Sequence, residues 1–372
     1  MAQVGLVATN HPNMARIEPL RWGILGVANI AVNKVIPAMR ASSRARVVAI
    51  ASRDIARARR SAQALDIPKA FGSYDELLAD PDVDTVVNTT IPAAHVDVTR
   101  AALEAGKHVH TEKPVAPRAE DAHALAALAR ERGVRLSCAP ATLLGEAQQT
   151  AWKLVREGGI GDVKVVYAEA NWGRIESWHP EPESLYVSGP LVDVGIYPLT
   201  IVTAWFGPVR RVSAYATTVQ PVRTRKDGRE FTLETPDFWV AELEHDTGVL
   251  TRLTATFWVR PGKQRGLELH GEEAALWMPT WAESNSRLQR TANGEDYEDV
   301  PLLREPYGGI DWAAALVDLD EAIRDDRPHR MGAEHAAHVV EVLNAADEAR
   351  GGGRAVELSS TFEQPQPLEW AR

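Results

Sequence analysis

Hydrophobic and polar positions follow two different patterns in the two parts of this chain. Between residues 20 and 140, short runs that are apolar along their whole length alternate with longer stretches of helical periodicity. The apolar runs predict strands at 20–27, 46–51, 83–90, 107–113 and 134–139. The stretches between them predict helices at 28–42, 54–65, 95–106 and 119–133. Strands that are apolar on both faces and separated by helices indicate a doubly wound parallel sheet, so this part is expected to be an α/β domain.

From residue 146 onward the pattern changes. A helix is expected at 146–157, and after it polar residues alternate with apolar ones in strand-like segments at 162–172, 210–220, 237–245, 248–259 and 264–271. Such alternation predicts an antiparallel sheet with one covered face. A final amphipathic helix is expected over 332–349, ending at the glycines of 351–353.

Composition changes at the same place. The chain has 372 residues, which is enough for two domains. Of its 11 tryptophans, only Trp22 precedes residue 150. Residues 1–150 hold 18 basic and 15 acidic side chains, so a net charge of −10 for the whole chain leaves −13 for the remainder. We therefore expect a flexible N-terminal arm of residues 1–19, a first domain of 20–145 and a second of 146–372.

Composition also excludes several classes of protein. An acidic chain lacks the clustered positive charge that non-specific binding to nucleic acid or anionic membranes requires. No apolar run approaches the ~18 residues needed to cross a bilayer, and the first twenty residues lack the apolar core of a signal peptide. The single cysteine, Cys138, excludes internal disulfides and cysteine-cluster metal sites. A cytoplasmic location is expected.

A glycine-containing turn at 23–31 lies between the first strand and the first helix. A dinucleotide pyrophosphate needs a tight turn, close backbone approach and free N–H groups at a helix start. Gly26, Ala28 and Ala31 occupy the three small-residue positions of the dinucleotide-binding pattern. Gly26, Ala28, Asn29 and Ile30 are therefore candidate cofactor-binding residues, although a purely structural glycine turn would look the same.

The tip of the second strand bears on the choice of cofactor. An acidic residue there would bind ribose hydroxyls and repel a 2′-phosphate. This chain instead has Ser52, a hydroxyl donor, and Arg53, a guanidinium that favours phosphate. NADP is therefore expected, while Asp54 one residue later keeps NAD open. Alternatively, Arg53 only begins an arginine-rich helix surface.

Two further segments follow strand ends, where an open α/β sheet places its ligands. The first supplies Thr90, Pro92 and His95, and the second supplies Glu112 and Lys113, all candidate cofactor-binding residues. A lysine ammonium at a strand tip can polarise a carbonyl or lower the pKa of a neighbouring acid. The alternative for Lys113 is a solvated surface charge.

Asp193 and Tyr197 are four residues apart, so on a helix they share one face. A phenol, with a pKa of ~10, suits proton transfer at neutral pH only when a nearby ammonium lowers that pKa. Lys113, Asp193 and Tyr197 together could move an alcohol proton while a hydride leaves the same carbon. In isolation, Asp193 could equally cap a helix start and Tyr197 could be a core residue.

The order of these motifs resembles the Gfo/Idh/MocA oxidoreductases. The resemblance rests on GILGVANIA at 23–31, ASRD at 51–54, TEKP at 111–114, DVGIY at 193–197 and HGEEAAL at 270–276, and it covers about residues 20 to 350. It implies an N-terminal Rossmann domain that binds NADP or NAD. It also implies a C-terminal substrate-binding domain with a large open antiparallel sheet, often used to form homodimers or homotetramers.

The same resemblance assigns catalysis to Lys113, Asp193 and Tyr197. Most members have histidine at the position of Tyr197, and the tyrosine here resembles the glucose–fructose oxidoreductase, xylose dehydrogenase and dihydrodiol dehydrogenase branches. The chain departs from the family at Ala28, where a glycine is usual, and at 188–190, where SGP replaces GGG. It departs again at 138–145, where CAPATLLG replaces the frequent N-x-R-[FY] segment that usually helps to shape the substrate pocket.

Candidate substrate-binding residues lie between the first strand of the second domain and the Asp193 segment. Aromatic faces can stack on a sugar ring, and Arg and His can donate to hydroxyls. Trp172, Arg174, Trp178 and His179 therefore suit a carbohydrate pocket, although both tryptophans could be core residues under a loop. His335 and His338 invite a metal interpretation, but ordinary helix polarity is favoured and no metal is expected.

The sequence thus predicts an NAD(P)-dependent dehydrogenase or reductase acting on a sugar, polyol or related cyclic alcohol, with Asp193 and Tyr197 also contacting substrate. Two alternatives stay open. One is a sugar hydrolase or epimerase that oxidises its substrate transiently with tightly bound cofactor. The other is a non-catalytic cofactor-sensing regulator on the same fold.

Overall fold

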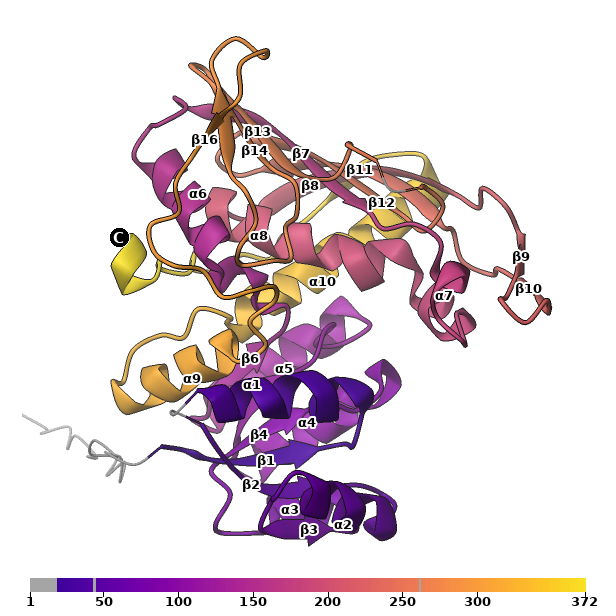
Figure 1. Ribbon diagram of the computed structural model, residues 1–372, viewed down its shortest axis with the longest axis vertical. Coiled ribbons are helices and arrows are strands. Elements are labelled where there is room, and N and C mark those ends of the chain that lie inside the picture. The colour runs from indigo at the N-terminus through magenta and orange to yellow at the C-terminus, as the bar shows by residue number, and fades with distance from the viewer. Residues whose placement is uncertain (1–18, 43–44, 261) are drawn as a thin grey trace, which may run out of the picture.

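The computed structural model describes residues 19–42, 45–260 and 262–372. Two sheets, each covered by its own helices, make up these residues (Figure 1). The predicted N-terminal arm, except for its last residue, lies outside them.

The first sheet has six parallel strands in the order β3-β2-β1-β4-β5-β6. This confirms the predicted doubly wound parallel sheet. In this first domain, the short elements β3 and α3 were not predicted, because each has too few residues to show a strand or helix periodicity. The strands are β1 Arg21–Leu25, β2 Arg46–Ala51, β3 Lys69–Phe71, β4 Thr85–Asn88, β5 His108–Thr111 and β6 Leu136–Cys138. The helices are α1 Ile36–Ala41, α2 Ile55–Ala64, α3 Tyr74–Leu78, α4 His95–Glu104 and α5 Ala119–Glu131.

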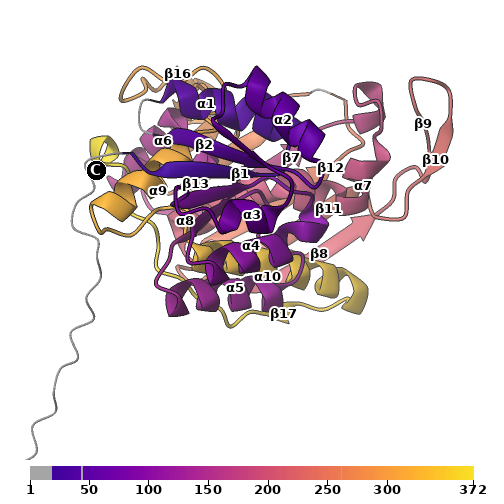
Figure 2. The same ribbon diagram turned by 90° about the horizontal axis from the view of Figure 1, so that it is seen from below.

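Helices cover both faces of this sheet, as Figure 2 shows with α1 and α2 on one side and α3, α4 and α5 on the other. In β1, Trp22 and Ile24 are fully buried against the α1 face, and Leu25 is fully buried against the opposite face. Burial on both sides is the physical reason that these strands are apolar at every position rather than at alternate ones.

The second sheet has nine strands in the order β16-β15-β14-β13-β7-β12-β11-β8-β17. The predicted antiparallel sheet is confirmed, with one parallel pair, β7 and β12. The chain leaves β7 through helices and returns through β8 and β11 before it forms β12. The strands are β7 Val163–Asn171, β8 Val209–Thr217, β11 Phe238–His245, β12 Leu250–Thr256, β13 Gly266–Gly271, β14 Ala275–Met278, β15 Gln289–Thr291, β16 Glu298–Asp299 and β17 Val356–Glu357. A separate hairpin pairs β9 Val222–Thr224 with β10 Glu230–Thr232.

Helices α6 Glu146–Arg156 and α8 Ile196–Phe206 pack on one face of this sheet (Figure 1). Helix α7, Glu183–Pro190, is kinked at Gly189 and is followed by a π-helical turn, Leu191–Gly195, and then by α8. Together these segments, Glu183–Phe206, are long and apolar enough to cross a membrane by length and composition, so the statement that no run approaches that length is corrected. Within it, 67% of the most apolar window is buried in the protein, as expected for a core helix.

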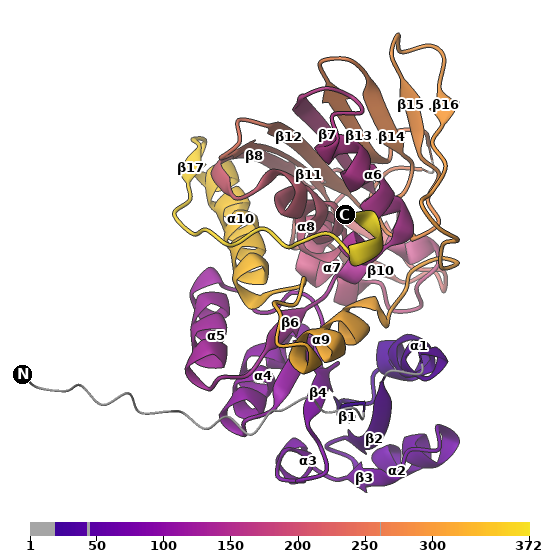
Figure 3. The same cartoon turned by 90° about the vertical axis from the view of Figure 1, so that its left-hand side faces the viewer.

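Two helices near the C-terminus connect the sheets, α9 Ala314–Arg324 and α10 Ala333–Gly352 (Figure 3). Leu316 and Leu319 of α9 belong to the core under α1, and α10 packs against both α5 and β8. The expectation of an amphipathic final helix is therefore wrong, because α10 is buried on two sides.

Buried histidines of α10 contact neighbouring elements through hydrogen bonds. His335 Nε2 lies 2.7 Å from Thr203 Oγ1, and His338 Nε2 accepts the N–H of Val209 at 2.9 Å. Burial lowers the pKa of His338 to about 4, so it stays neutral at physiological pH. Across the described ranges, no group of three or more His, Cys, Asp or Glu is arranged to hold a metal ion.

Candidate active site

The turn after β1 is held open by a glycine. Gly26 has φ of +101°, and a Cβ placed there would lie 3.1 Å from the carbonyl oxygen of Thr89. Its N–H donates to the Ala51 carbonyl oxygen at 3.0 Å, which fixes the turn against β2. Ala28 and Ile30 are partly exposed and Asn29 is exposed, at the start of a helix that passes through a π-helical turn at Ala31–Val35. The turn therefore leaves backbone surface accessible for a pyrophosphate.

Just after the tip of β2, the carboxylate of Asp54, which could have bound a ribose, makes hydrogen bonds within the protein. Asp54 caps α2, with its Oδ1 accepting the N–H groups of Ala56 at 2.9 Å and Arg57 at 3.2 Å. Ser52 is buried, and its Oγ accepts the N–H of Asp54 at 3.2 Å. Arg53 is exposed at the start of the helix.

Sequence reasoning missed Arg57. Its guanidinium donates to the carbonyl oxygen of Val27, within the glycine turn, and so lies beside the predicted pyrophosphate site. Local sequence gives no sign of this contact, because Val27 lies 30 residues before Arg57.

His95 connects two loops at the edge of the sheet. It is 1% exposed, with Nδ1 2.7 Å from the Pro114 carbonyl oxygen and Nε2 3.1 Å from that of Thr90. Burial lowers the pKa of His95. The assignment of His95 as a cofactor contact is corrected, because both ring nitrogens face main-chain carbonyls. The ring instead holds the loop of Thr90 and Pro92 against the segment that carries Lys113.

The two parts of the chain meet at Lys113. Its Nζ donates to the Asp193 carboxylate at 2.7 Å and to the Asp193 carbonyl oxygen at 2.7 Å. Asp193 lies in a π-helical turn, Leu191–Gly195, and does not cap a helix start. The side chains of both residues are mostly buried, which strengthens their attraction. This is the pairing that the motifs, 80 residues apart, implied.

Tyr197 completes the cluster, with its ring centroid 5.4 Å from Lys113 Nζ. Burial raises the pKa of Tyr197 to about 12, although the ammonium of Lys113 acts in the opposite direction. The expectation that the ammonium would bring this pKa down toward neutrality is therefore wrong, because loss of hydration outweighs the charge. Tyr197 therefore keeps its proton at neutral pH.

Two neighbouring groups have shifted pKa values as well. Burial by itself would lower the pKa of Lys113, but Tyr197, Asp193 and Glu112 outweigh it and raise that pKa. Lys113 is therefore an ammonium at physiological pH. Burial raises the pKa of Glu112, which Lys113 offsets in part.

A break in the helix places Asp193. Gly189 has φ of +70°, outside the helical region, and Pro190 begins the next turn. Proline at a helix start costs nothing, since its missing N–H would have no helical partner there. The SGP sequence at 188–190 thus changes the chain direction just before the segment that carries Asp193.

Aromatic side chains extend from Tyr197. The ring of Trp281 lies 5.0 Å from that of Tyr197, and the ring of Trp172 lies 6.2 Å from that of Trp281. Trp172 and Trp178 are each 51% exposed, so the alternative that they are core residues is wrong. Trp281 was missed, because nothing in its local sequence distinguishes it from a core tryptophan.

The other predicted substrate residues are arranged differently. Arg174 lies 3.8 Å from the ring centroid of Trp258, whose ring also faces Arg223 at 4.2 Å. Arg174 thus packs on this ring, and its contact with substrate stays a prediction. Trp178 contacts His179 edge-on at 5.4 Å, and none of the described contacts joins this pair to Tyr197 or Lys113.

The CAPATLLG segment borders the same cluster. Residues 139–142 line a small cavity of about 20 Å³ together with Glu112, Tyr197 and Trp312. The hydroxyl of Thr142 is buried there without a hydrogen-bond partner among the described residues. The segment therefore contributes to the surroundings of Tyr197, as its place in the motif order suggested.

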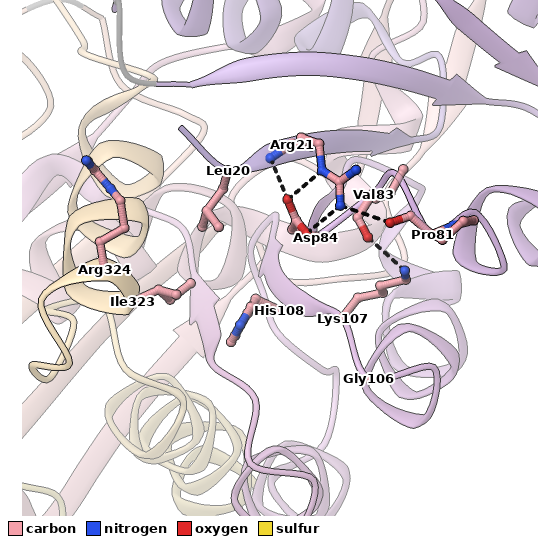
Figure 4. A pocket seen from close by; sticks show the side chains of 10 residues that line it. All are labelled: Leu20, Arg21, Pro81, Val83, Asp84, Gly106, Lys107, His108, Ile323 and Arg324. Atoms are coloured by element: carbon pink, nitrogen blue, oxygen red, sulfur yellow. Dashed lines mark hydrogen bonds and ion pairs between the residues drawn. The ribbon is translucent and has the colours of Figure 1, made fainter. Parts of the chain in front are cut away.

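Another pocket lies at the opposite, amino-terminal ends of β1, β4 and β5 (Figure 4). Arg21 binds Asp84 and Asp82 with nitrogen–oxygen distances of 2.9 and 2.8 Å. Lys107 Nζ donates to the carbonyl oxygens of Asp80 and Val83 at 3.0 and 2.7 Å. Arg21 and Lys107 thus have partners within the protein. Because ligands of open α/β sheets bind at the carboxyl ends of the strands, this pocket is not the candidate active site.

Comparison with family models gives two matches. Residues 20–139 match the oxidoreductase family with an NAD-binding Rossmann fold, GFO/IDH/MocA. Residues 148–277 match the GFO/IDH/MocA C-terminal domain.

Similar proteins include D-xylose 1-dehydrogenase (NADP(+)) 2 of Haloferax volcanii, 34% identical over 91% of this chain and 100% of that protein. Trans-1,2-dihydrobenzene-1,2-diol dehydrogenase of Bos taurus is 36% identical over 50% of this chain. An uncharacterized oxidoreductase of Rhizobium meliloti is 36% identical over 49% of this chain. The chain spans only 56% and 55% of the length of the last two proteins.

Solved structures share the fold. An aldose-aldose oxidoreductase from Caulobacter crescentus, complexed with glycerol, superimposes with a TM-score of 0.78 at 24% identity, covering 92% of this chain and 100% of that one. A 3-ketoreductase from Actinomadura kijaniata, in complex with TDP-benzene and NADP, gives a TM-score of 0.72 at 23% identity, covering 89% and 98%.

Proposed function

The chain belongs to the GFO/IDH/MocA oxidoreductase family, and from that premise we propose that it transfers a hydride between a nicotinamide cofactor and a sugar, polyol or related cyclic alcohol. The observation that carries this proposal is the contact of Lys113 Nζ with the Asp193 carboxylate at 2.7 Å, beside Tyr197. Neither an isolated binding domain nor a structural role requires an ammonium, a carboxylate and a phenol at this edge of the sheet.

The residues at the glycine turn fit a dinucleotide. The positive φ of Gly26 lets the main chain approach a pyrophosphate where a Cβ would meet the Thr89 carbonyl. The exposed start of the following helix, at Asn29, supplies N–H groups for phosphate oxygens. When bound, the nicotinamide supplies or accepts the hydride.

Tyr197 is proposed to exchange the proton on the reacting oxygen. Its O–H is retained at neutral pH, because burial raises the pKa to about 12. Lys113, kept as an ammonium, attracts the developing negative charge on that oxygen, and Asp193 orients the ammonium through its 2.7 Å contact. Because Tyr197 and Lys113 are both protonated at neutral pH, they can supply the proton that reduction of a carbonyl consumes.

NADP is the proposed cofactor. Arg53 and Arg57 stand at the tip of β2, and Asp54 is engaged as a helix cap, which removes the group that would select NAD. Arg53→Ala should raise KM for NADP by about 10- to 100-fold, the usual worth of a charge-assisted contact, and change KM for NAD little. Steady-state kinetics with both cofactors measures this, with Arg60→Ala, an exposed arginine of the following helix α2, as the matched control. Equal changes for both cofactors would contradict the preference.

The function itself is tested by assaying the purified protein with NADP and NAD, and with their reduced forms, against aldoses, polyols, cyclic diols and the corresponding carbonyl compounds. A net change in nicotinamide absorbance that depends on one of these substrates is expected. Sugar conversion without any net change would instead indicate transient oxidation with retained cofactor. Cofactor binding without turnover of any member of the panel would oppose the assignment.

A cytoplasmic homo-oligomer is also proposed. The face of the second sheet that points away from the helices exposes Tyr215 at 62% and Leu250 at 50%, which suits burial against another subunit. Light scattering on the purified protein would detect a dimer or tetramer.

A further inference from the structure

A cavity of about 710 Å³ lies where β7 ends and β13 begins. Its wall includes Trp172 and Trp281, the two tryptophans that continue from Tyr197. Trp281 therefore belongs both to this cavity and to the surroundings of the proposed proton donor. A substrate that reacts at Tyr197 and extends past Trp281 would enter this space.

Positive charge gathers along one side of the cavity. Arg260, Lys263 and Arg265 all come from the connection between β12 and β13, and all three are exposed. They lie in the part of the chain that carries a net charge of −13, so their clustering runs against the local composition.

The acidic residues of the cavity do not cancel this charge. Glu169 is buried and accepts from Arg252 Nη2 at 2.5 Å and from Asn171 Nδ2 at 3.0 Å. The other acidic residue in the wall is Glu283. A fourth basic residue, Arg287, donates from Nε and Nη2 to the carboxylate oxygens of Asp299 at 2.5 and 2.8 Å, so Asp299 neutralises its charge. Three cations against Glu283 leave a net positive rim.

The aromatic and the basic side chains of the cavity suit different parts of a ligand. The exposed half of the Trp172 ring offers a flat apolar face on which a sugar ring can stack. Guanidinium groups bind carboxylate or phosphate oxygens with paired N–H donors, and lysine adds a point charge. A neutral polyol would use the aromatic face and leave the cations without a role.

We propose that the substrate is a sugar or cyclic alcohol that bears an anionic group, a phosphate or a carboxylate, held by Arg260, Lys263 and Arg265 while the ring lies against Trp172. This inference rests on the proposed function, and it names the substrate class for the same site. Phosphate and carboxylate share the recognition chemistry, so the experiment separates them.

The test compares three related probes, glucose, glucose 6-phosphate and glucuronate. Calorimetry without catalysis is expected to show binding of glucose 6-phosphate or glucuronate about tenfold tighter than glucose, weakening as salt rises from 50 to 500 mM, because exposed ion pairs are screened. Tighter binding of one anion than the other identifies the group. Equal affinity for all three probes would overturn the inference.

Variants then locate the binding. Arg265→Gln and Lys263→Gln should each lower the ratio of anionic to neutral probe affinity about five- to tenfold, and Arg265→Lys should retain part of it. Lys226→Gln, an exposed lysine on the β9–β10 turn, is the matched control and should leave the ratio unchanged. An unchanged ratio in Arg265→Gln and Lys263→Gln would overturn the assignment of these residues. Because binding is measured without turnover, failure here is distinguishable from failure of the proposed hydride transfer.

Discussion

Replacing Lys113 with alanine is expected to lower kcat by about 10²–10⁴-fold, the usual contribution of a positioned acid–base group, while the cofactor still binds. The ammonium contacts the Asp193 carboxylate at 2.7 Å and lies 5.4 Å from the Tyr197 ring. Removing it takes away the positive charge that stabilises negative charge on the reacting oxygen, and it leaves Asp193 without its cation. Cofactor affinity depends mainly on the glycine turn and the tip of β2, which this substitution does not touch.

The loss should appear in kcat rather than in the dissociation constant of the cofactor, measured by fluorescence titration. Lys164→Ala is a matched control, because that lysine is exposed on the second sheet and pairs only with Asp162 at 3.5 Å and Glu272 at 3.3 Å among its described ion pairs. Thermal unfolding shows whether each variant is folded. A folded Lys113→Ala enzyme with near-normal kcat would remove the basis of the assignment.

Tyr197→Phe is expected to lower kcat by about 10²–10³-fold with little change in stability. The phenylalanine ring keeps the packing against Trp281, at 5.0 Å between centroids, and only the hydroxyl is lost. Tyr215→Phe, on the exposed face of the second sheet, removes the same atom away from the site and should have no effect on kcat. If Tyr197→Phe turned over as fast as the parent enzyme, the proton would have to come from another group.

The rates of carbonyl reduction and of alcohol oxidation should depend differently on pH because of the same hydroxyl. Burial raises the pKa of Tyr197 to about 12, so the protonated form predominates throughout the physiological range. Carbonyl reduction needs that proton and should be nearly independent of pH between about 6 and 9. Alcohol oxidation needs the deprotonated group, so its rate should rise with pH toward the alkaline limit of stability. An oxidation rate that reached its plateau near pH 7 would mean that binding of cofactor and substrate brings this pKa down.

Local sequence was sufficient for the parts of the site that depend on one segment. Gly26 was identifiable because a strand, a glycine turn and a helix follow one another directly, and the positive φ there is a local property. Ser52 and Arg53 likewise follow directly after β2, as the sequence predicted. Asp54 illustrates the limit, since its choice between binding a ribose and capping α2 depends on how the side chain is turned.

The sequence was a poorer guide to residues whose contacts come from segments far away along the chain. His95 looked like a cofactor contact, but its ring lies between the carbonyl oxygens of Thr90 and Pro114 and is buried. Trp281 and Arg57 were missed because their partners, Tyr197 and Val27, are 84 and 30 residues away. The packing of Arg174 on the ring of Trp258, 84 residues away, was likewise not predicted.

The sequence by itself determined the alternation that builds a parallel sheet, the change of pattern near residue 146, and the three chemical groups of the site, because periodicity and motif spacing are written along the chain. Only the tertiary structure decided which way the proton equilibrium of Tyr197 shifts, since burial and the Lys113 charge act in opposite directions and their balance depends on depth. It also decided that β7 and β12 run parallel and that α10 is buried on two sides. These features arise from contacts between segments far apart in sequence, which no local pattern encodes.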